Sequence, residues 1–239
     1  MRLQLKLESR KTVTQEHFFK SYFTDMHGIL AKIVGKDEDY GKFCFGNIFP
    51  ILKQQIDESK IYSLIISSSE PGIIEKLFFS FEIGSNINIG ELQFKIIDVN
   101  IFTRKLHKNT IIESMTPLNI TINDNGNVRF LKFDNPKYLE YLGQHLLNKY
   151  TFLKGNKSEI DLFENVDLDV HEKHPFSCFQ INFYNKGENK NFKVCGSKLV
   201  FKFNNISDEQ LKIFQTLFDS GFGERTTFGA GFMIERIVK

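Results

Sequence analysis

Six histidines are the side chains of this sequence best suited to transfer protons near neutral pH, because a free imidazole has a pKa of about 6.5. They are His17, His27, His107, His145, His171 and His174. His27 lies in a helical pattern with Phe23 and Leu30 one turn away on either side, so it borders an apolar face. From these residues alone, His27 is interpreted as a structural histidine at a helix edge, and acid or base catalysis is the alternative.

Two other histidines raise the question of a metal site. His171 and His174 are three residues apart and could bring two imidazoles to one metal ion or one basic site. Pro175 argues against a long helix there, and no further converging ligand is visible, so no metal site is predicted. His17, at a helix start, and His145, within a helix, are interpreted as structural.

The cysteine spacing does not indicate a disulfide framework or a structural metal site. Cys44, Cys178 and Cys195 are an odd number, without a CxxC pair or a histidine at zinc-finger spacing. The pattern therefore predicts three buried free thiols, with neither a disulfide nor a structural metal.

Residues 221–233, GFGERTTFGAGFM, form the most specific local pattern and are called the glycine segment below. Its glycines are Gly221, Gly223, Gly229 and Gly231, and Arg225 lies between them. Exposed backbone amides and a guanidinium could hold phosphate oxygens. The alternative is a helix stop followed by a glycine-rich hairpin into the last strand. The spacing fits neither a Walker loop nor a dinucleotide-binding loop.

The elements that must position these residues are read from hydrophobic periodicity. In the first half, the patterns predict strands at 2–8, 42–50, 61–68 and 91–105 and helices at 15–34 and 70–84. In the second half, they predict strands at 114–122, 128–133, 177–185, 191–204 and 231–239 and helices at 136–153 and 206–221. Strand, helix, strand, strand, helix, strand is the ferredoxin-like order.

Because the second half repeats that order, the predicted fold class is α+β, with tandem ferredoxin-like (RRM-like) domains and a C-terminal glycine-rich loop. The predicted boundaries are 1–118 and 119–239, and a single mixed α+β domain is the alternative.

With 41% hydrophobic and 25% charged residues, the composition is that of a soluble globular protein. The net charge of +2 gives no global basic signal for nucleic acid. No apolar stretch is long enough to cross a bilayer, so we expect a cytoplasmic protein without a membrane partner.

A helix followed by GxGERxxxGxG and a final apolar strand resembles the glycine-rich loop of the RAMP proteins of CRISPR systems, and within them the Cas6 repeat-processing endoribonucleases. RLQLKL, HGIL, KFCFGNIFP, IISSSEPG and TPLNITI occur in the matching order, so the resemblance spans nearly the whole chain. It implies tandem ferredoxin-like domains, binding of CRISPR repeat RNA, and cleavage of precursor CRISPR RNA to a 2′,3′-cyclic phosphate and a 5′-hydroxyl. The implied reaction uses no metal and no cofactor.

The resemblance also suggests catalytic residues. The family usually has a catalytic histidine after the first helix, shortly before a Lys-Phe segment. Here the loop at 35–42 contains no histidine, although Lys42 before Phe43 matches the family lysine. His27 is the best substitute, and Tyr40 and Lys42 would orient the hydroxyl and stabilise phosphate charge.

For RNA binding, the candidates are the four glycines with Arg225, together with Lys36 and Arg129. Phe130 and Phe133 are candidates for base stacking, and the acidic run at 159–172 should face away from RNA. Other Cas proteins and a second copy of the chain remain open as partners. Two alternatives stay beside the endoribonuclease: a repeat-RNA-binding protein with weak or absent catalysis, and a structural RAMP subunit of an effector complex.

Overall fold

The computed structural model describes residues 1–14, 21–35, 41–50, 55–124, 127–172, 174–185 and 188–236. The elements of the first unit are β1 (Arg2–Ser9), β2 (Val13–Thr14), α2 (Tyr22–Val34), β3 (Phe43–Phe45), β4 (Gln55–Ile56), β5 (Ile61–Ser68), α3 (Pro71–Ser80), β6 (Asn86–Ile89) and β7 (Leu92–Phe102). Those of the second unit are β8 (Ile111–Ser114), β9 (Thr121–Asp124), β10 (Asn127–Phe130), α4 (Tyr138–Lys154), β11 (Val166–Val170), β12 (Phe176–Asn185), β13 (Glu188–Ser197), β14 (Leu199–Phe203), α5 (Asp208–Ser220), the 3-10 turn η1 (Thr226–Phe228) and β15 (Met233–Glu235).

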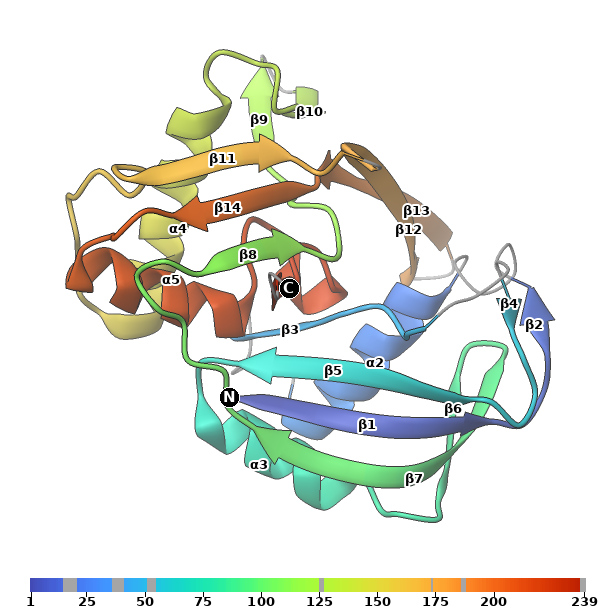
Figure 1. Ribbon diagram of the computed structural model, residues 1–239. Helices are drawn as coiled ribbons and strands as arrows, with labels where there is room; N and C mark the ends of the chain where they lie inside the picture. The colour runs from blue at the N-terminus through green and yellow to red at the C-terminus, as the bar shows by residue number, and fades with distance from the viewer. Residues whose placement is uncertain are drawn as a thin grey trace.

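The first unit is an antiparallel sheet in the order β3-β5-β1-β7-β6. Without the edge strand β6, this is the ferredoxin-like order. Leu3, Leu5 and Leu7 alternate along β1 and are fully buried, which is why the period-two pattern predicted this strand. Helices α2 and α3 pack on one face of the sheet, behind it in Figure 1. The short strand β6 was not predicted.

The second unit repeats the arrangement in the order β11-β14-β8-β15. Two expectations were wrong here. The first strand of the unit is β8, at Ile111–Ser114, rather than 114–122, and β11 lies inside the run that was interpreted only as acidic. In β11 the aspartates alternate with Val166, Leu168 and Val170, so one face is apolar although the composition is acidic. The boundary expected at 118/119 stays a prediction.

Two hairpins project from the second unit as separate two-stranded ribbons, β9–β10 and β12–β13 (Figure 1). The strand predicted at 177–185 corresponds to β12, and the single strand predicted at 191–204 is divided between β13 and β14. For β9–β10 the predicted strands reach only residues 121–122 and 128–130. The register of β12–β13 sets Cys178 directly opposite Cys195, and the two form a disulfide. The expectation of three free thiols was therefore wrong, and Cys44 is the free and buried cysteine.

Helix α5 begins and ends as its sequence predicts. The backbone N–H of Gln210 donates to Ser207 Oγ at 3.1 Å, and the backbone N–H of Ser207 donates to Gln210 Oε1 at 2.8 Å. Together these two bonds form a complete capping box. Gly221 ends the helix with φ 84°. In the described parts of the chain, no helix combines the length and the apolar character needed to span a membrane.

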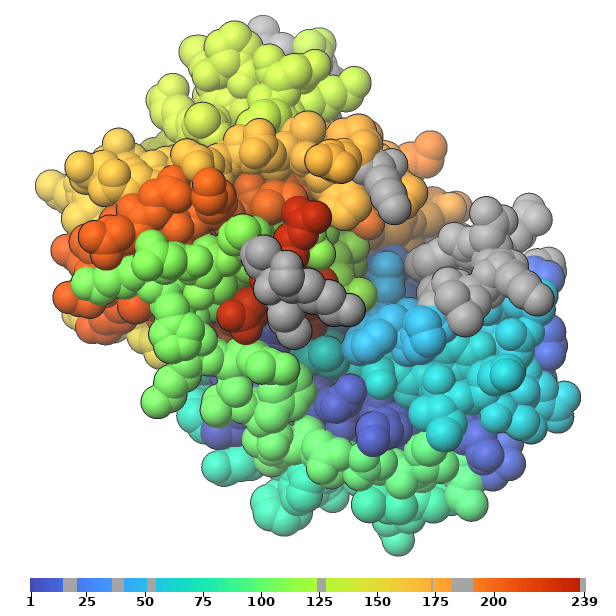
Figure 2. All heavy atoms as spheres, viewed as in Figure 1, coloured from blue at the N-terminus to red at the C-terminus, as the bar shows by residue number. Residues whose placement is uncertain are grey.

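The glycine segment joins the two hydrophobic cores. Its Phe228 and Ala230 belong to the core of the first unit, whereas Phe222 and Met233 belong to the core of the second. Figure 2 shows the two units in contact, and the green segment that follows β7 in the chain runs from one unit to the other. The glycine segment is thus a packed connection between the units.

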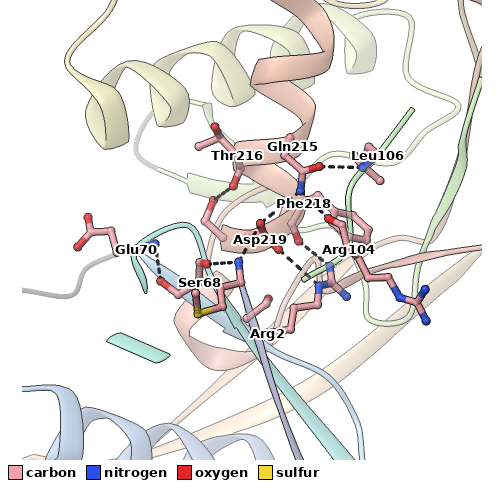
Figure 3. A network of polar contacts seen from close by, with 12 residues as sticks. Arg2, Ser68, Glu70, Arg104, Leu106, Gln215, Thr216, Phe218 and Asp219 are labelled. Carbon is pink, nitrogen blue, oxygen red and sulfur yellow. Dashed lines mark hydrogen bonds and ion pairs between the residues drawn. The ribbon is translucent and has the colours of Figure 1, made fainter. Parts of the chain in front are cut away.

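A polar network at the start of β1 links the units as well (Figure 3). The Met1 ammonium is 3.0 Å from Asp219 Oδ2 of α5 and donates to the Ser68 carbonyl at 2.9 Å. Arg2, only 2% exposed, lies 3.8 Å from the centre of the Phe218 ring and donates to the Phe218 carbonyl at 2.9 Å. Arg2 Nε is 3.5 Å from Asp219 Oδ1, an ion pair rather than a well-formed hydrogen bond. Burial lowers the pKa of Arg2 to about 10, so the guanidinium stays charged at neutral pH.

Candidate active site

The glycine segment is close-packed, which explains its composition. Gly229 has φ 83°, and a Cβ added there would lie 2.8 Å from Phe23 Cδ1 and 3.0 Å from Phe45 Cε2 of the first unit. The Gly229 amide donates to the Thr226 carbonyl and the Gly231 amide to the Pro117 carbonyl, both at 2.8 Å. These amides are therefore already bonded within the protein instead of exposed for phosphate. Contact of the four glycines with RNA stays a prediction.

His27 projects from α2 onto this segment. Its Nδ1 is 2.9 Å from the Thr227 carbonyl oxygen, and its ring is centred 3.9 Å from that of Phe228. A carbonyl oxygen can only accept a hydrogen bond, so Nδ1 carries the proton in the neutral form and the lone pair is on Nε2. Nε2 has no bond to any residue within the described ranges and is not among the buried unpaired atoms, so it is open to solvent.

The electrostatics of His27 favour the same state. Burial lowers the pKa of the half-buried imidazole below its usual 6.5, and the hydrogen bond to Thr227 opposes this shift less strongly. At neutral pH the ring is thus uncharged and presents an accessible lone pair. That is the state that a general base requires.

Lys149 of α4 fixes the other side of the glycine segment. Its ammonium donates three hydrogen bonds of 2.9 Å, to the Ser220 carbonyl, the Gly221 carbonyl and Thr226 Oγ1. Burial lowers the pKa of Lys149 to about 7, whereas three acceptors favour the charged form. All three donors of the ammonium are used, so Lys149 ties α4 to the end of α5 and to the segment.

A cavity of about 500 Å³ lies between α4 and the glycine segment, and is called the loop cavity. Its walls include His145 and Lys149 from α4, Arg225 and Thr227 from the segment, and Gly41. Burial lowers the pKa of His145, and the Glu224 carboxylate and the Gly223 backbone act in the opposite direction. The loop cavity is therefore lined by the neutral imidazole of His145 and by the exposed guanidinium of Arg225, which belongs to the same glycine segment that His27 contacts.

The remaining sequence candidates do not line this cavity within the described residues. Lys42 follows Gly41, but its ammonium lies 3.4 Å from Glu70 Oε1 at the start of α3, so the expected phosphate lysine has a carboxylate partner. Tyr40 and Lys36 lie outside the described residues. Arg129 is exposed on β10, opposite Ile122 of β9.

The sequence interpretation treated His145 as structural and placed Lys149 with Lys154 and Lys157 in a basic cluster that could follow phosphates or form a solvated face. The signal that it passed over is their spacing of four on one helix, which puts both on one face between the buried Leu142, Leu146 and Tyr150. What they contact comes from residues far away in the sequence.

Comparison with known proteins identifies the chain. The family model described as "CRISPR associated protein Cas6, C-terminal" matches residues 102–235, which is more than half of the chain. A CRISPR-associated endoribonuclease Cas6 2 from Methanocaldococcus jannaschii is 23% identical over 98% of this chain and 98% of its own length. A putative CRISPR-associated endoribonuclease-like protein Cas6 from Pyrococcus furiosus is 24% identical over 82% of this chain and 79% of its own.

The fold agrees with solved structures. One, described as an RAMP protein binding different RNA substrates, aligns with a TM-score of 0.69 at 19% identity and covers 99% of this chain and 100% of the other. Tandem ferredoxin-like sheets are thus shared at the level of fold. With the match of the family model, this chain belongs to the Cas6 family of CRISPR-associated RAMP proteins.

Proposed function

We propose that this chain is an endoribonuclease that binds CRISPR repeat RNA and cleaves the precursor by attack of a ribose 2′-hydroxyl on the adjacent phosphodiester. The P–O bond to the 5′-oxygen breaks as the new P–O bond forms, which leaves a 2′,3′-cyclic phosphate and a 5′-hydroxyl. The reaction needs a base for the 2′-hydroxyl proton and an acid for the 5′-oxygen, and no metal ion is a reactant. The names of the two relatives support endoribonuclease activity.

The observation that carries the proposal is the bond between His27 Nδ1 and the Thr227 carbonyl. It leaves Nε2 as an open acceptor beside the glycine segment, where it would remove the proton of the 2′-hydroxyl. Arg225, exposed on the wall of the loop cavity, would bind the phosphate and stabilise charge that develops on it. The 5′-oxygen would take its proton from solvent, because burial lowers the pKa of His145 in the loop cavity and leaves that imidazole uncharged at neutral pH.

The first experiment is single-turnover cleavage of end-labelled repeat RNA in EDTA, beside the same RNA with a single 2′-deoxy nucleotide at the cut site. We expect cleavage in EDTA and its loss with the deoxy substrate. Cleavage of the deoxy RNA, or cleavage that requires added magnesium, would reject the mechanism. Specific binding without cleavage of either RNA would reject the enzyme and favour a protein that only holds repeat RNA.

The residue assignment is tested with His27→Ala and His27→Asn. A general base contributes about 10² to 10⁴ in rate, so both variants should lose about that factor in single-turnover rate while RNA affinity is kept. His27→Asn retains a side-chain N–H for the Thr227 carbonyl and separates loss of the base from loss of the loop contact. Imidazole added to His27→Ala should restore part of the rate.

His107→Ala is the matched control, because His107 is exposed in the segment between β7 and β8. It should cleave like the wild type. If His27→Ala also cleaves at the wild-type rate, His27 is structural and the base lies elsewhere.

A further inference from the structure

A second hollow of about 430 Å³, called the hairpin groove, lies between the ribbons β9–β10 and β12–β13. Val128 and Phe130 line it from β10 and Phe192 from β13, while Phe228 of the glycine segment contributes to it from within. The two ribbons project from the second unit outside its four-stranded sheet (Figure 1). The groove is therefore built by elements that the ferredoxin-like sheet itself does not require.

The groove exposes apolar surface that folding alone does not explain. Val128 is 67% exposed, Phe192 50% and Phe130 37%. Large apolar side chains gathered at one exposed hollow usually mark a binding surface. Two of the three are aromatic, and an aromatic ring offers a flat face on which a nucleobase can stack.

The charge around the groove indicates the kind of ligand. Arg225 and Lys193 line it and are exposed, and its described lining includes no carboxylate. A ligand that matches both features has a flat apolar group and, a few covalent bonds away, a negatively charged group. A nucleotide has this combination, whereas an apolar peptide helix would leave both cations without partners.

We propose that the hairpin groove binds one unpaired nucleotide of the repeat RNA, with its base against Phe130 and Phe192 and its phosphate at Arg225 and Lys193. The inference rests on the proposed function, since it names part of the substrate of that site. A base in an A-form stem is stacked and paired, so the nucleotide in the groove must come from a single-stranded or extruded position. The Phe228 ring lies against His27, so this nucleotide is adjacent to the proposed base.

The protein side is tested by equilibrium binding of the non-cleavable 2′-deoxy repeat RNA, so that catalysis does not enter the measurement. Phe130→Ala and Phe192→Ala should each weaken binding about tenfold to a hundredfold, the usual cost of removing one stacking partner. Phe79→Ala is the matched control, because Phe79 is an 84% exposed phenylalanine on α3 of the other unit. It should bind like the wild type.

The charge contribution is tested by salt dependence. Lys193→Gln should reduce the slope of log affinity against log salt concentration by about 1, as expected for loss of one phosphate contact. Lys212→Gln, at an exposed position of α5, is the control and should leave the slope unchanged. An unchanged slope in Lys193→Gln would show that Lys193 contacts no phosphate of the RNA.

The RNA side is tested by replacing one base at a time with an abasic site. We expect one position where base removal weakens wild-type binding but does not further weaken Phe192→Ala, because both changes remove the same contact. Additive losses at every position would overturn the proposal. So would a dimer of the wild type that Phe192→Ala dissociates in sedimentation, because the groove would then hold a second copy.

These outcomes are separable from failure of the proposed function. If the groove variants lose affinity and the wild type never cleaves, the groove stands and the catalytic proposal fails. If the wild type cleaves and the groove variants bind and cleave normally, the catalytic proposal stands and the groove assignment fails.

Discussion

At His27, one hydrogen bond determines both orientation and tautomer. The Thr227 carbonyl accepts a hydrogen bond from Nδ1–H, which keeps the proton on Nδ1 and leaves Nε2 as the acceptor. The sequence alone favoured a structural role for this histidine, and the resemblance to Cas6 proteins favoured catalysis. The structure gives His27 a contact suited to both roles, because the bond that orients the ring also holds the glycine segment.

The lowered pKa of His27 predicts the acid side of the pH–rate profile. Only the neutral imidazole accepts the 2′-hydroxyl proton, so the cleavage rate should rise with pH through a midpoint below 6.5. Between that midpoint and 6.5 the unfolded chain binds more protons at this site, so His27 makes stability rise with pH in the same window. Single-turnover rates across acid and neutral pH check this. A midpoint above 6.5, or the same limb in His27→Ala, would contradict it.

Replacing Lys149 by methionine should lower the free energy of unfolding. Lys149→Met keeps the aliphatic stem but leaves the Ser220 and Gly221 carbonyls and Thr226 Oγ1 without their donor. We expect about 1 to 3 kcal/mol of destabilisation in urea unfolding. Lys212→Met, at an exposed site on α5, should change stability by less than about 0.5 kcal/mol. Equal stability of Lys149→Met and wild type would mean that water replaces the ammonium.

At the scale of elements, local patterns predicted what local forces decide. The apolar alternation of β1 and the Ser207 cap with the Gly221 stop of α5 each involve neighbouring residues, and these elements formed as predicted. The ribbon β12–β13 was predicted only as strands, because its partner in space depends on pairing that local composition does not encode. The same holds for Lys149, whose acceptors come from α5 and the glycine segment.

The disulfide follows from the register of that ribbon and predicts a simple chemical result. Alkylation of the unfolded, unreduced protein should modify Cys44 alone, and reduction beforehand should expose Cys178 and Cys195 as well. Mass spectrometry counts the added groups. Modification of all three cysteines without reductant would show that the two thiols facing each other across the ribbon are not joined in the purified protein.

At the scale of the whole molecule, the polar network at Arg2 and the glycine segment link the same two units. The sheets repeat one topology, but their packing depends on contacts between residues at opposite ends of the chain, such as Arg2 with Phe218 and Asp219. Periodicity predicted most helices and strands of each unit, although it missed β6 and β11 and misplaced β8. The contacts between the two units could not be predicted from periodicity, because no local pattern marks Arg2 as a buried cation.

Asp219→Ala should therefore destabilise the protein strongly. Removing one partner leaves the buried Arg2 guanidinium without its carboxylate, which costs about 3 to 5 kcal/mol for a buried pair. Asp167→Ala is the control, because its pair with Lys202 is exposed and should contribute about 0 to 1 kcal/mol. Urea unfolding measures both. Similar small effects would mean that water and the Phe218 ring are sufficient to solvate Arg2.

The position of Phe228 has a consequence for how this protein would discriminate between RNA sequences. The ring lines both the loop cavity and the hairpin groove and lies against His27. A base that fits the groove poorly would therefore disturb the imidazole as well as its own stacking. Selectivity would then be expressed in turnover as well as in affinity, so that a mismatched repeat is bound more weakly and, once bound, is cut more slowly.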